Sequence, residues 1–154
     1  MNVPDLREEV AYHLDQMQVV VDELAALRRD VGSREPTNRE VAAVSSFLMQ
    51  FYTGVENILK RISKHNDVPL PSGAEWHVAL LGRFGTPPAP GLPALFDDVL
   101  AEDLDVFRRF RHVARAAYGL ELDWKKLTIG LDYVAPVFAR FRTAVTEYLD
   151  RLED

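Results

Sequence analysis

A run of basic side chains within an otherwise acidic chain is the part of this sequence best suited to chemistry. The stretch FRRFRHVARAAYG, residues 107–119, carries four arginines and one histidine, whereas the whole chain has a net charge of −6. On a helix that turns about 100° per residue, these residues separate into two opposite sides. The polar side comprises Arg108, Arg111, His112, Arg115 and Tyr118, and the core side comprises Phe107, Phe110, Ala114 and Ala117. Because guanidinium groups grip phosphate oxygens through charge-assisted hydrogen bonds, the polar side is typical of a phosphate-binding surface.

The same stripe has a simpler interpretation, which the sequence leaves open. Arginines on one helix face are commonly solvated or paired with acidic residues of a neighbouring helix. Two of these arginines have an acidic residue within reach along the helix, Arg109 with Asp105 and Arg108 with the more distant Asp103. Arg111 and Arg115 have no acidic residue three or four positions away, so their charge is left for a phosphate or for an acid elsewhere in the fold.

The composition excludes several other classes of site. With no cysteine, the chain has no disulfide framework, thiolate zinc site or cysteine nucleophile. Neither a G-x-S-x-G elbow, a P-loop nor a Rossmann glycine pattern occurs. No apolar signal core or membrane span is present, so we expect a cytoplasmic protein that does not associate with membranes. The acidic net charge confines any contact with nucleic acid to a local basic patch.

The histidines and glutamates give no metal-ligand spacing. The four histidines lack an H-x-x-x-H pattern, and no glutamate belongs to an E-x-x-H motif. His13 and His65 are expected at the surface, and His77 is expected to pack or to form a hydrogen bond rather than to bind a metal. We therefore expect neither a metal nor a cofactor.

Helical periodicity runs through almost the whole chain and places the basic stretch on one helix of a bundle. Apolar residues recur every three or four positions, and nothing reads as a strand. The expected helices are Pro4–Val31, Thr37–His65, Ser72–Arg83, Asp97–Tyr118 and Asp123–Leu152. A chain of 154 residues fits a single domain. The predicted fold is therefore an all-α antiparallel bundle of four to five helices, spanning residues 1–154.

Capping and helix-breaking residues set these boundaries. Thr37 with Glu40, and Ser72 with Glu75, are each spaced as a capping box. The stretch GTPPAPGLP, residues 85–93, has four prolines and is expected to be a loop. Single residues predict the remaining features, namely a C-terminal cap at Gly119, an N-cap at Asp123 and a kink or helix break at Pro136.

Three stretches of the sequence resemble HepT-like toxins of the HEPN superfamily. The arginine-rich stretch and the ELDW that follows are similar to the C-terminal half of these proteins. FYTGVENILKRI, residues 51–62, and LPSGAEWH, residues 70–77, also look like that family. The resemblance covers roughly residues 40 to 150, and its most specific part is the arginine-rich helix.

The resemblance implies a homodimeric, all-α, metal-independent endoribonuclease with an R-x4-H-x-Y motif. In that family the ribose 2′-hydroxyl attacks the adjacent phosphate, with the histidine as general acid/base and the arginine stabilising phosphate charge. The usual partner is a small nucleotidyltransferase (MntA-like) antitoxin, which in some pairs adenylylates the motif tyrosine. By position, Arg111 matches the arginine, Tyr118 matches the tyrosine that accepts the adenylyl group, and Ala116 stands where the histidine is expected. The residues expected to contact RNA are Arg108, Arg111, His112 and Arg115.

Alanine at position 116 predicts that this chain cleaves RNA poorly or not at all. A positioned acid/base contributes about 10²–10⁴-fold to the rate. His112 lies one helical turn, about 6 Å, from position 116, which is a large displacement for catalysis. Either the alanine is an inactivating substitution made so that a toxic protein could be produced, or the chain is a natural degenerate member kept for binding. We favour the first explanation because Arg111, Arg115 and Tyr118 remain.

Two other functions stay open at the level of sequence. A non-enzymatic helical interaction module would use the same basic face to bind an acidic protein or a nucleotide. The other alternative is a helical domain that assists a nucleotidyltransferase. The leading prediction is an HEPN-type endoribonuclease toxin of a toxin–antitoxin pair, impaired at Ala116.

Overall fold

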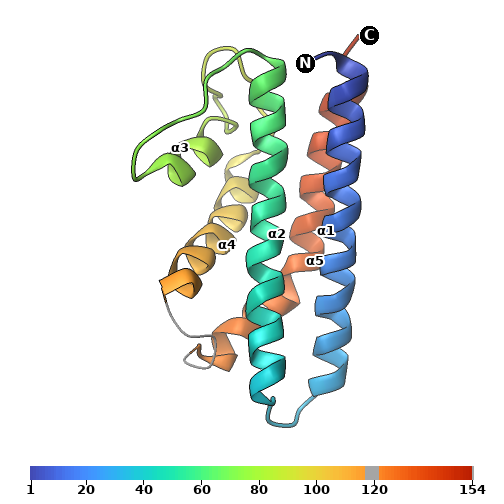
Figure 1. Ribbon diagram of the computed structural model, residues 1–154, viewed down its shortest axis with the longest axis vertical. Coiled ribbons are helices and arrows are strands. Elements are labelled where there is room, and N and C mark those ends of the chain that lie inside the picture. The colour runs from blue at the N-terminus through green and yellow to red at the C-terminus, as the bar shows by residue number, and fades with distance from the viewer. Residues whose placement is uncertain (117–121, 154) are drawn as a thin grey trace.

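The computed structural model describes residues 1–116 and 122–153, which form five α-helices and, within those ranges, no strand (Figure 1). The helices are α1 (Val3–Val31), α2 (Asn38–His65), α3 (Trp76–Gly82), α4 (Asp98–Ala116) and α5 (Trp124–Asp150). The four long helices alternate in direction along the chain, and the short α3 lies outside them, beside α2 and α4 (Figure 1). The predicted all-α bundle is confirmed. None of the described helices is both long and apolar enough to cross a membrane.

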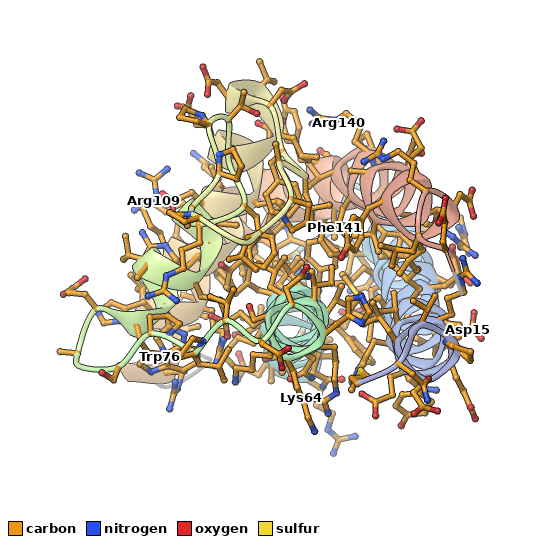
Figure 2. The ribbon with its side chains drawn as sticks, turned by 90° about the horizontal axis from the view of Figure 1, so that it is seen from above. Asp15, Lys64, Trp76, Arg109, Arg140 and Phe141 are labelled. Atoms are coloured by element: carbon orange, nitrogen blue, oxygen red, sulfur yellow. The ribbon has the colours of Figure 1, made fainter. Side chains whose placement is uncertain are left out.

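Helix α2 is the centre of the bundle, because it contacts each of the other four helices. Phe51 of α2 is fully buried and meets Phe107 of α4 and Phe138 of α5 edge to face, with ring centroids 5.1 Å and 6.2 Å apart. Phe141 of α5 lies in the middle of the bundle when it is seen from above, with charged residues such as Lys64 around the edge (Figure 2). The aromatic core therefore fixes α4 against α2 and α5.

A glycine sets the close approach of α1 to α2. A Cβ atom at Gly54 would lie 2.5 Å from Cγ of Met17, closer than packed atoms approach. Met17 itself is buried at 2% exposure, so its side chain fills the space that a larger residue would need. This contact holds α2 in place from the side opposite α4.

Two of the predicted helix starts are confirmed. Thr37 and Glu40 form the capping box, and Arg34 also donates to Glu40 through Nη1 at 2.8 Å and Nη2 at 2.6 Å. Because Arg34 and the backbone of Thr37 both donate to this carboxylate, the pKa of Glu40 is lowered to about 2. Asp123 is the N-cap of α5, where its side chain accepts a hydrogen bond from the backbone N–H of Lys125.

The predicted capping box of Ser72 with Glu75 is wrong. Helix α3 begins at Trp76, and its N-cap residue Glu75 makes no side-chain capping hydrogen bond. Gly73 adopts a φ of 91°, and its carbonyl accepts from the N–H of Trp76 at 3.3 Å, so a turn occupies the place of the expected first helical residues. A glycine can adopt this conformation without strain, and it is the residue that the capping pattern overlooked.

The end of α5 differs in detail from the prediction, and the predicted end of α4 at Tyr118 lies outside the described residues. Pro136 lies inside α5, which remains one helix rather than two, although its axis changes direction along its length (Figure 1). The helix ends at Asp150 instead of Leu152. Proline removes one hydrogen bond of the helix, and a bend is the usual consequence. The predicted cap at Gly119 lies outside the described residues.

The proline-rich loop joins the end of α3 to the start of α4, as predicted for residues 85–93. Phe84 and Phe96 flank it and are both buried, at 0% and 1% exposure. The carbonyl of Phe84 accepts hydrogen bonds from the N–H groups of Leu95 and Phe96, at 2.9 Å and 3.1 Å. The loop is thus closed at its base, and it brings α3 back against α4.

Candidate functional site

A pocket between α3 and α4 gathers the predicted basic residues. Its cavity has a volume of about 130 Å³. One wall consists of Arg108, Arg111, His112 and Arg115 from α4, and the other of Ala74, Glu75, His77 and Val78 from α3 and the turn before it. All the predicted RNA-contacting side chains therefore line one cavity, whose second wall the sequence had not identified.

The core side of α4 explains why these side chains face the pocket. Phe107 and Ala114 are buried at 2% and 6% exposure, and Phe110 packs against the core while remaining partly exposed. Apolar burial of this side turns the opposite side of the helix toward α3 and solvent. The predicted core face is confirmed at these three positions, and Ala117 lies outside the described residues.

A single buried carboxylate joins three helices beneath the pocket. Glu56 of α2 is only 2% exposed. Its Oε1 accepts a hydrogen bond from Nη1 of Arg111 on α4, and its Oε2 lies 2.6 Å from Nδ1 of His77 on α3. The acid that Arg111 lacks on its own helix is therefore supplied by a neighbouring helix, which was one of the alternatives left open. Burial of a charge requires such partners, and Glu56 has two.

The neighbouring arginines Arg108 and Arg109 of α4 share one acidic partner, Asp105. Arg108 donates to Asp105 at 2.5 Å, and this hydrogen bond raises the pKa of Arg108. Arg109 also pairs with Asp105, at 3.3 Å, as predicted. The expected pairing of Arg108 with Asp103 is wrong, because Asp103 pairs with Arg140 of α5.

The two other α4 residues that line the pocket, His112 and Arg115, lie at its open side. Arg115 and His112 are exposed. Within residues 1–116 and 122–153, neither side chain forms an ion pair or a side-chain hydrogen bond. Their donors are thus available to a ligand, in contrast to those that Arg108 directs to Asp105.

His77 is held in a defined orientation. Its ring packs against that of Trp76, with centroids 3.5 Å apart and the ring planes tilted by 32°. The ammonium of Lys60 lies 4.6 Å from the centre of the Trp76 ring. The His77 side chain is 24% exposed, so one part faces the cavity while Nδ1 faces Glu56. The prediction that His77 forms a hydrogen bond is confirmed. His13 and His65, expected at the surface, are instead half-buried.

A buried tyrosine lies in the electrostatic field of the same network. The hydroxyl of Tyr52, one helical turn before Glu56, is buried and has no hydrogen-bond partner in the part of the chain that the structure describes. Burial, together with the negative charge of Glu56, raises the pKa of Tyr52 above its usual range. The phenol therefore stays protonated at neutral pH.

Sequence reasoning missed Glu56 as a site residue, although one signal was present. Tyr52 and Leu59, one turn before and after Glu56, are both fully buried, so Glu56 lies on an apolar side of a helix. A charged residue in such a position is rarely buried without a partner. Its partners are 21 and 55 residues away in sequence, and only the folded chain brings them together.

Two predicted site residues remain, Ala116 and Tyr118. Ala116 is the last residue of that helix. Tyr118, the predicted site of adenylylation, lies outside the described residues, so its role stays a prediction. Among residues 1–116 and 122–153, no group of three or more histidine, aspartate and glutamate side chains is arranged to hold a metal ion.

Comparison with known proteins adds one finding to this geometry. A family model described as HepT-like protein matches residues 43–152, which is more than half of the chain. The match includes α3, α4 and most of α2, the helices that build the pocket and the Glu56 network. No curated protein and no solved structure gives a significant match.

Proposed function

Because the chain belongs to the HepT-like family, we propose that it is the toxin of a toxin–antitoxin pair and that the pocket between α3 and α4 binds RNA. The observation that carries this proposal is the convergence of Arg108, Arg111, His112 and Arg115 on one cavity of an acidic chain. Net repulsion opposes binding elsewhere on such a protein, so a polyanion is drawn to this local patch.

The arginines of the pocket suit the chemistry of RNA cleavage by the 2′-hydroxyl. That reaction develops negative charge on the phosphate oxygens, which fixed guanidinium donors stabilise. A guanidinium carries five N–H donors, and Arg111 uses Nη1 to reach Glu56. The pairing with Glu56 therefore orients Arg111 while leaving further donors for a phosphate. Arg115 adds a positive charge at the open side of the cavity.

Position 116 limits how this chemistry can proceed. Alanine has no group that can transfer a proton, so the family motif on α4 alone does not supply an acid/base. Cleavage that depended on that position would be slower by about 10²–10⁴-fold. RNA binding does not depend on it, because the arginines that contact phosphate are retained.

A homodimer and an antitoxin complete the proposed function. An apolar groove between α4 and α5 includes Val106, Val113 and Ile129, which are 42%, 57% and 55% exposed. Exposed apolar patches of this kind are typical of protein–protein contacts, and this one supports association of two copies. A nucleotidyltransferase antitoxin is the proposed second partner. An AMP group added to Tyr118, two residues after Ala116 in the sequence, would add negative charge and oppose the binding of RNA.

A matched pair of arginine variants tests RNA binding. Binding of a fluorescently labelled single-stranded RNA is measured by anisotropy for the unaltered protein, Arg115→Ala and Arg29→Ala. Both substitutions remove one exposed positive charge, but Arg29 is on α1, which forms no wall of the pocket. We expect Arg115→Ala to weaken binding about 5–10-fold, the value of one charge-assisted phosphate contact, and Arg29→Ala to change it less than about 2-fold. Equal effects of the two variants would contradict a localised RNA site.

A non-enzymatic interaction module remains the second candidate function. The observation in its favour is that Arg111 and His77 are both engaged by Glu56, an arrangement that also stabilises the junction of three helices. RNA or nucleotide binding without cleavage, both before and after Ala116→His, is the outcome that favours this candidate. Growth arrest on expression, accompanied by RNA cleavage, favours the toxin.

A further inference from the structure

We propose that His77 is the catalytic base of this pocket and that Glu56 is the residue that positions it. The inference rests on the proposed function, and it assigns the proton transfer to a residue outside the motif on α4. His77 lies in the wall opposite that motif and lines the same cavity as Arg108, Arg111 and Arg115. A base on the α3 wall does not require a histidine at position 116.

The hydrogen bond to Glu56 determines which nitrogen of His77 can act as a base. An ionised carboxylate only accepts hydrogen bonds, so Nδ1 of His77 carries the hydrogen that is donated to Oε2 of Glu56 at 2.6 Å. In the neutral ring the lone pair is then on Nε2. A carboxylate behind a histidine both fixes the tautomer and stabilises the imidazolium that forms when Nε2 accepts a proton.

The surroundings of His77 hold the ring still and leave it accessible. The Trp76 ring packs against it at a tilt of 32°, and the His77 side chain, which lines the cavity, is 24% exposed. Arg111 is bound to the other oxygen of the same carboxylate, so Glu56 fixes both the base and a phosphate-binding group. Such preorganisation of two groups is what a positioned acid/base reaction needs.

The proposed step balances without a metal or a cofactor. Nε2 of His77 removes the proton of the ribose 2′-hydroxyl, and the 2′-oxygen forms a bond to the adjacent phosphorus. The bond from phosphorus to the 5′-oxygen breaks, and that oxygen takes a proton from a water molecule. The hydroxide left behind takes the proton from His77, which restores the neutral ring. The products are a 2′,3′-cyclic phosphate and a 5′-hydroxyl end, and Arg111 stabilises the charge on the phosphate during the transfer.

His112 is less suited to the same role. It lines the pocket but is exposed, and no carboxylate in the described part of the chain accepts a hydrogen bond from its ring. Its ring therefore lacks the orientation that Glu56 gives to His77. His112 is better placed to contact phosphate at the mouth of the pocket than to remove a proton within it.

The test is single-turnover cleavage of a labelled RNA, with RNA affinity measured on the same proteins. His77→Gln should lower the cleavage rate by about 10²–10⁴-fold while RNA affinity changes less than about 2-fold. The control His13→Gln, a half-buried histidine remote from α3 and α4, should leave both values unchanged. A substrate with a 2′-deoxyribose at the cleavage position should be bound and not cut.

Two further measurements separate a catalytic role from a structural one. Added imidazole should restore part of the cleavage by His77→Ala, because it can occupy the space of the lost ring and accept the proton. Glu56→Gln should lower the rate in the unaltered background and have a smaller effect in the His77→Ala background, where only its contact with Arg111 is left to alter. Circular dichroism of each variant shows whether it has kept the helical fold.

The possible outcomes separate this inference from the proposed function. If the unaltered protein binds RNA and its cleavage is insensitive to His77→Gln, or if it binds RNA without cleaving it, then His77 is not the base and the proposed RNA site stands. If the unaltered protein neither binds nor cleaves RNA, the proposed function itself fails. A folded His77→Ala protein that imidazole does not rescue also contradicts the inference.

Discussion

At the scale of the residue, Glu56 is the side chain on which the site depends most. It is a charged group at 2% exposure, and its two oxygens are shared between Arg111 and His77. Removing one partner of a buried ion pair leaves the other charge without compensation, whereas losing an exposed pair costs little. The network therefore contributes to stability as well as to the geometry of the pocket.

This difference predicts the effect of two matched substitutions on stability. Glu56→Ala should lower the free energy of unfolding by about 2–4 kcal/mol, because it leaves the largely buried Arg111 without its acid. Asp132→Ala breaks the Arg28–Asp132 pair, whose side chains are 40% and 56% exposed, and should cost less than about 0.5 kcal/mol. Urea unfolding followed by circular dichroism measures both values. Equal losses in the two variants would show that Glu56 is not a buried structural charge.

At the scale of the element, the start of α2 is fixed by groups close together in sequence. The pKa of Glu40 is lowered to about 2 from its ordinary value of 4.5, first by the hydrogen bonds from Arg34 and then by the backbone of Thr37. A carboxylate with a lowered pKa in the folded state stabilises the fold when it is ionised. Its contribution is thus complete above pH 4.5 and is lost as the pH falls toward 2.

A carboxyl titration followed by nuclear magnetic resonance tests this assignment. The chemical shift of the side-chain carboxyl carbon of Glu40 should titrate with a midpoint near pH 2. Arg34→Gln should move that midpoint upward toward 4.5. Arg29→Gln removes an exposed charge of the same type on α1 and should leave the midpoint in place. A midpoint that Arg34→Gln does not move would assign the shift to another cause.

The elements that sequence predicted correctly are those specified by local signals. The long helices follow from apolar spacing, and the Thr37 capping box and the Asp123 N-cap follow from residues within one turn. The predicted start of α3 was wrong because a capping pattern does not reveal the left-handed conformation of Gly73. Local spacing fixes which side chains share a helix face, but not what lies opposite that face.

In the candidate site, too, the residues related by local spacing were predicted, and those brought together by helix packing were not. Three arginines of α4 were predicted to act together because they are three and four residues apart, and the structure places Arg108, Arg111 and Arg115 in one pocket. Glu56 and His77 could not be joined to them from sequence, because packing of α2 and α3 decides that contact. The family match reaches all three helices without specifying the contact.

At the scale of the whole molecule, α4 contributes to two different surfaces, for which we propose different partners. The cavity beside α3 is lined by Arg108, Arg111 and Arg115, whereas the apolar groove beside α5 is lined by Val106, Arg109 and Val113. Arg109 lies at the periphery of the bundle when it is seen from above (Figure 2). The proposed RNA site and the proposed contact with a second copy of the chain therefore use different sides of one amphipathic helix.

A charge placed in the apolar groove tests the proposed homodimer. Val113→Glu should raise the dimer dissociation constant by at least about 10-fold, since burying an unpaired carboxylate in an apolar contact is unfavourable. Val19→Glu alters a valine of α1 with nearly the same exposure, 56% against 57%, and should leave association unchanged. Sedimentation over a range of concentrations measures both. A monomer at all concentrations before any substitution would contradict the homodimer.

Because the carboxylate of Glu56 binds both Arg111 and His77, it should affect how these positions change during evolution of the family. If Glu56 is substituted first, Arg111 loses its ion-pair partner and His77 loses the hydrogen bond that fixes its tautomer. Substitutions at positions 56, 77 and 111 should therefore accumulate together among related chains, as they do for residues that share one network. Position 116, which the base on α3 does not require, should be free to vary in chains that keep those three residues.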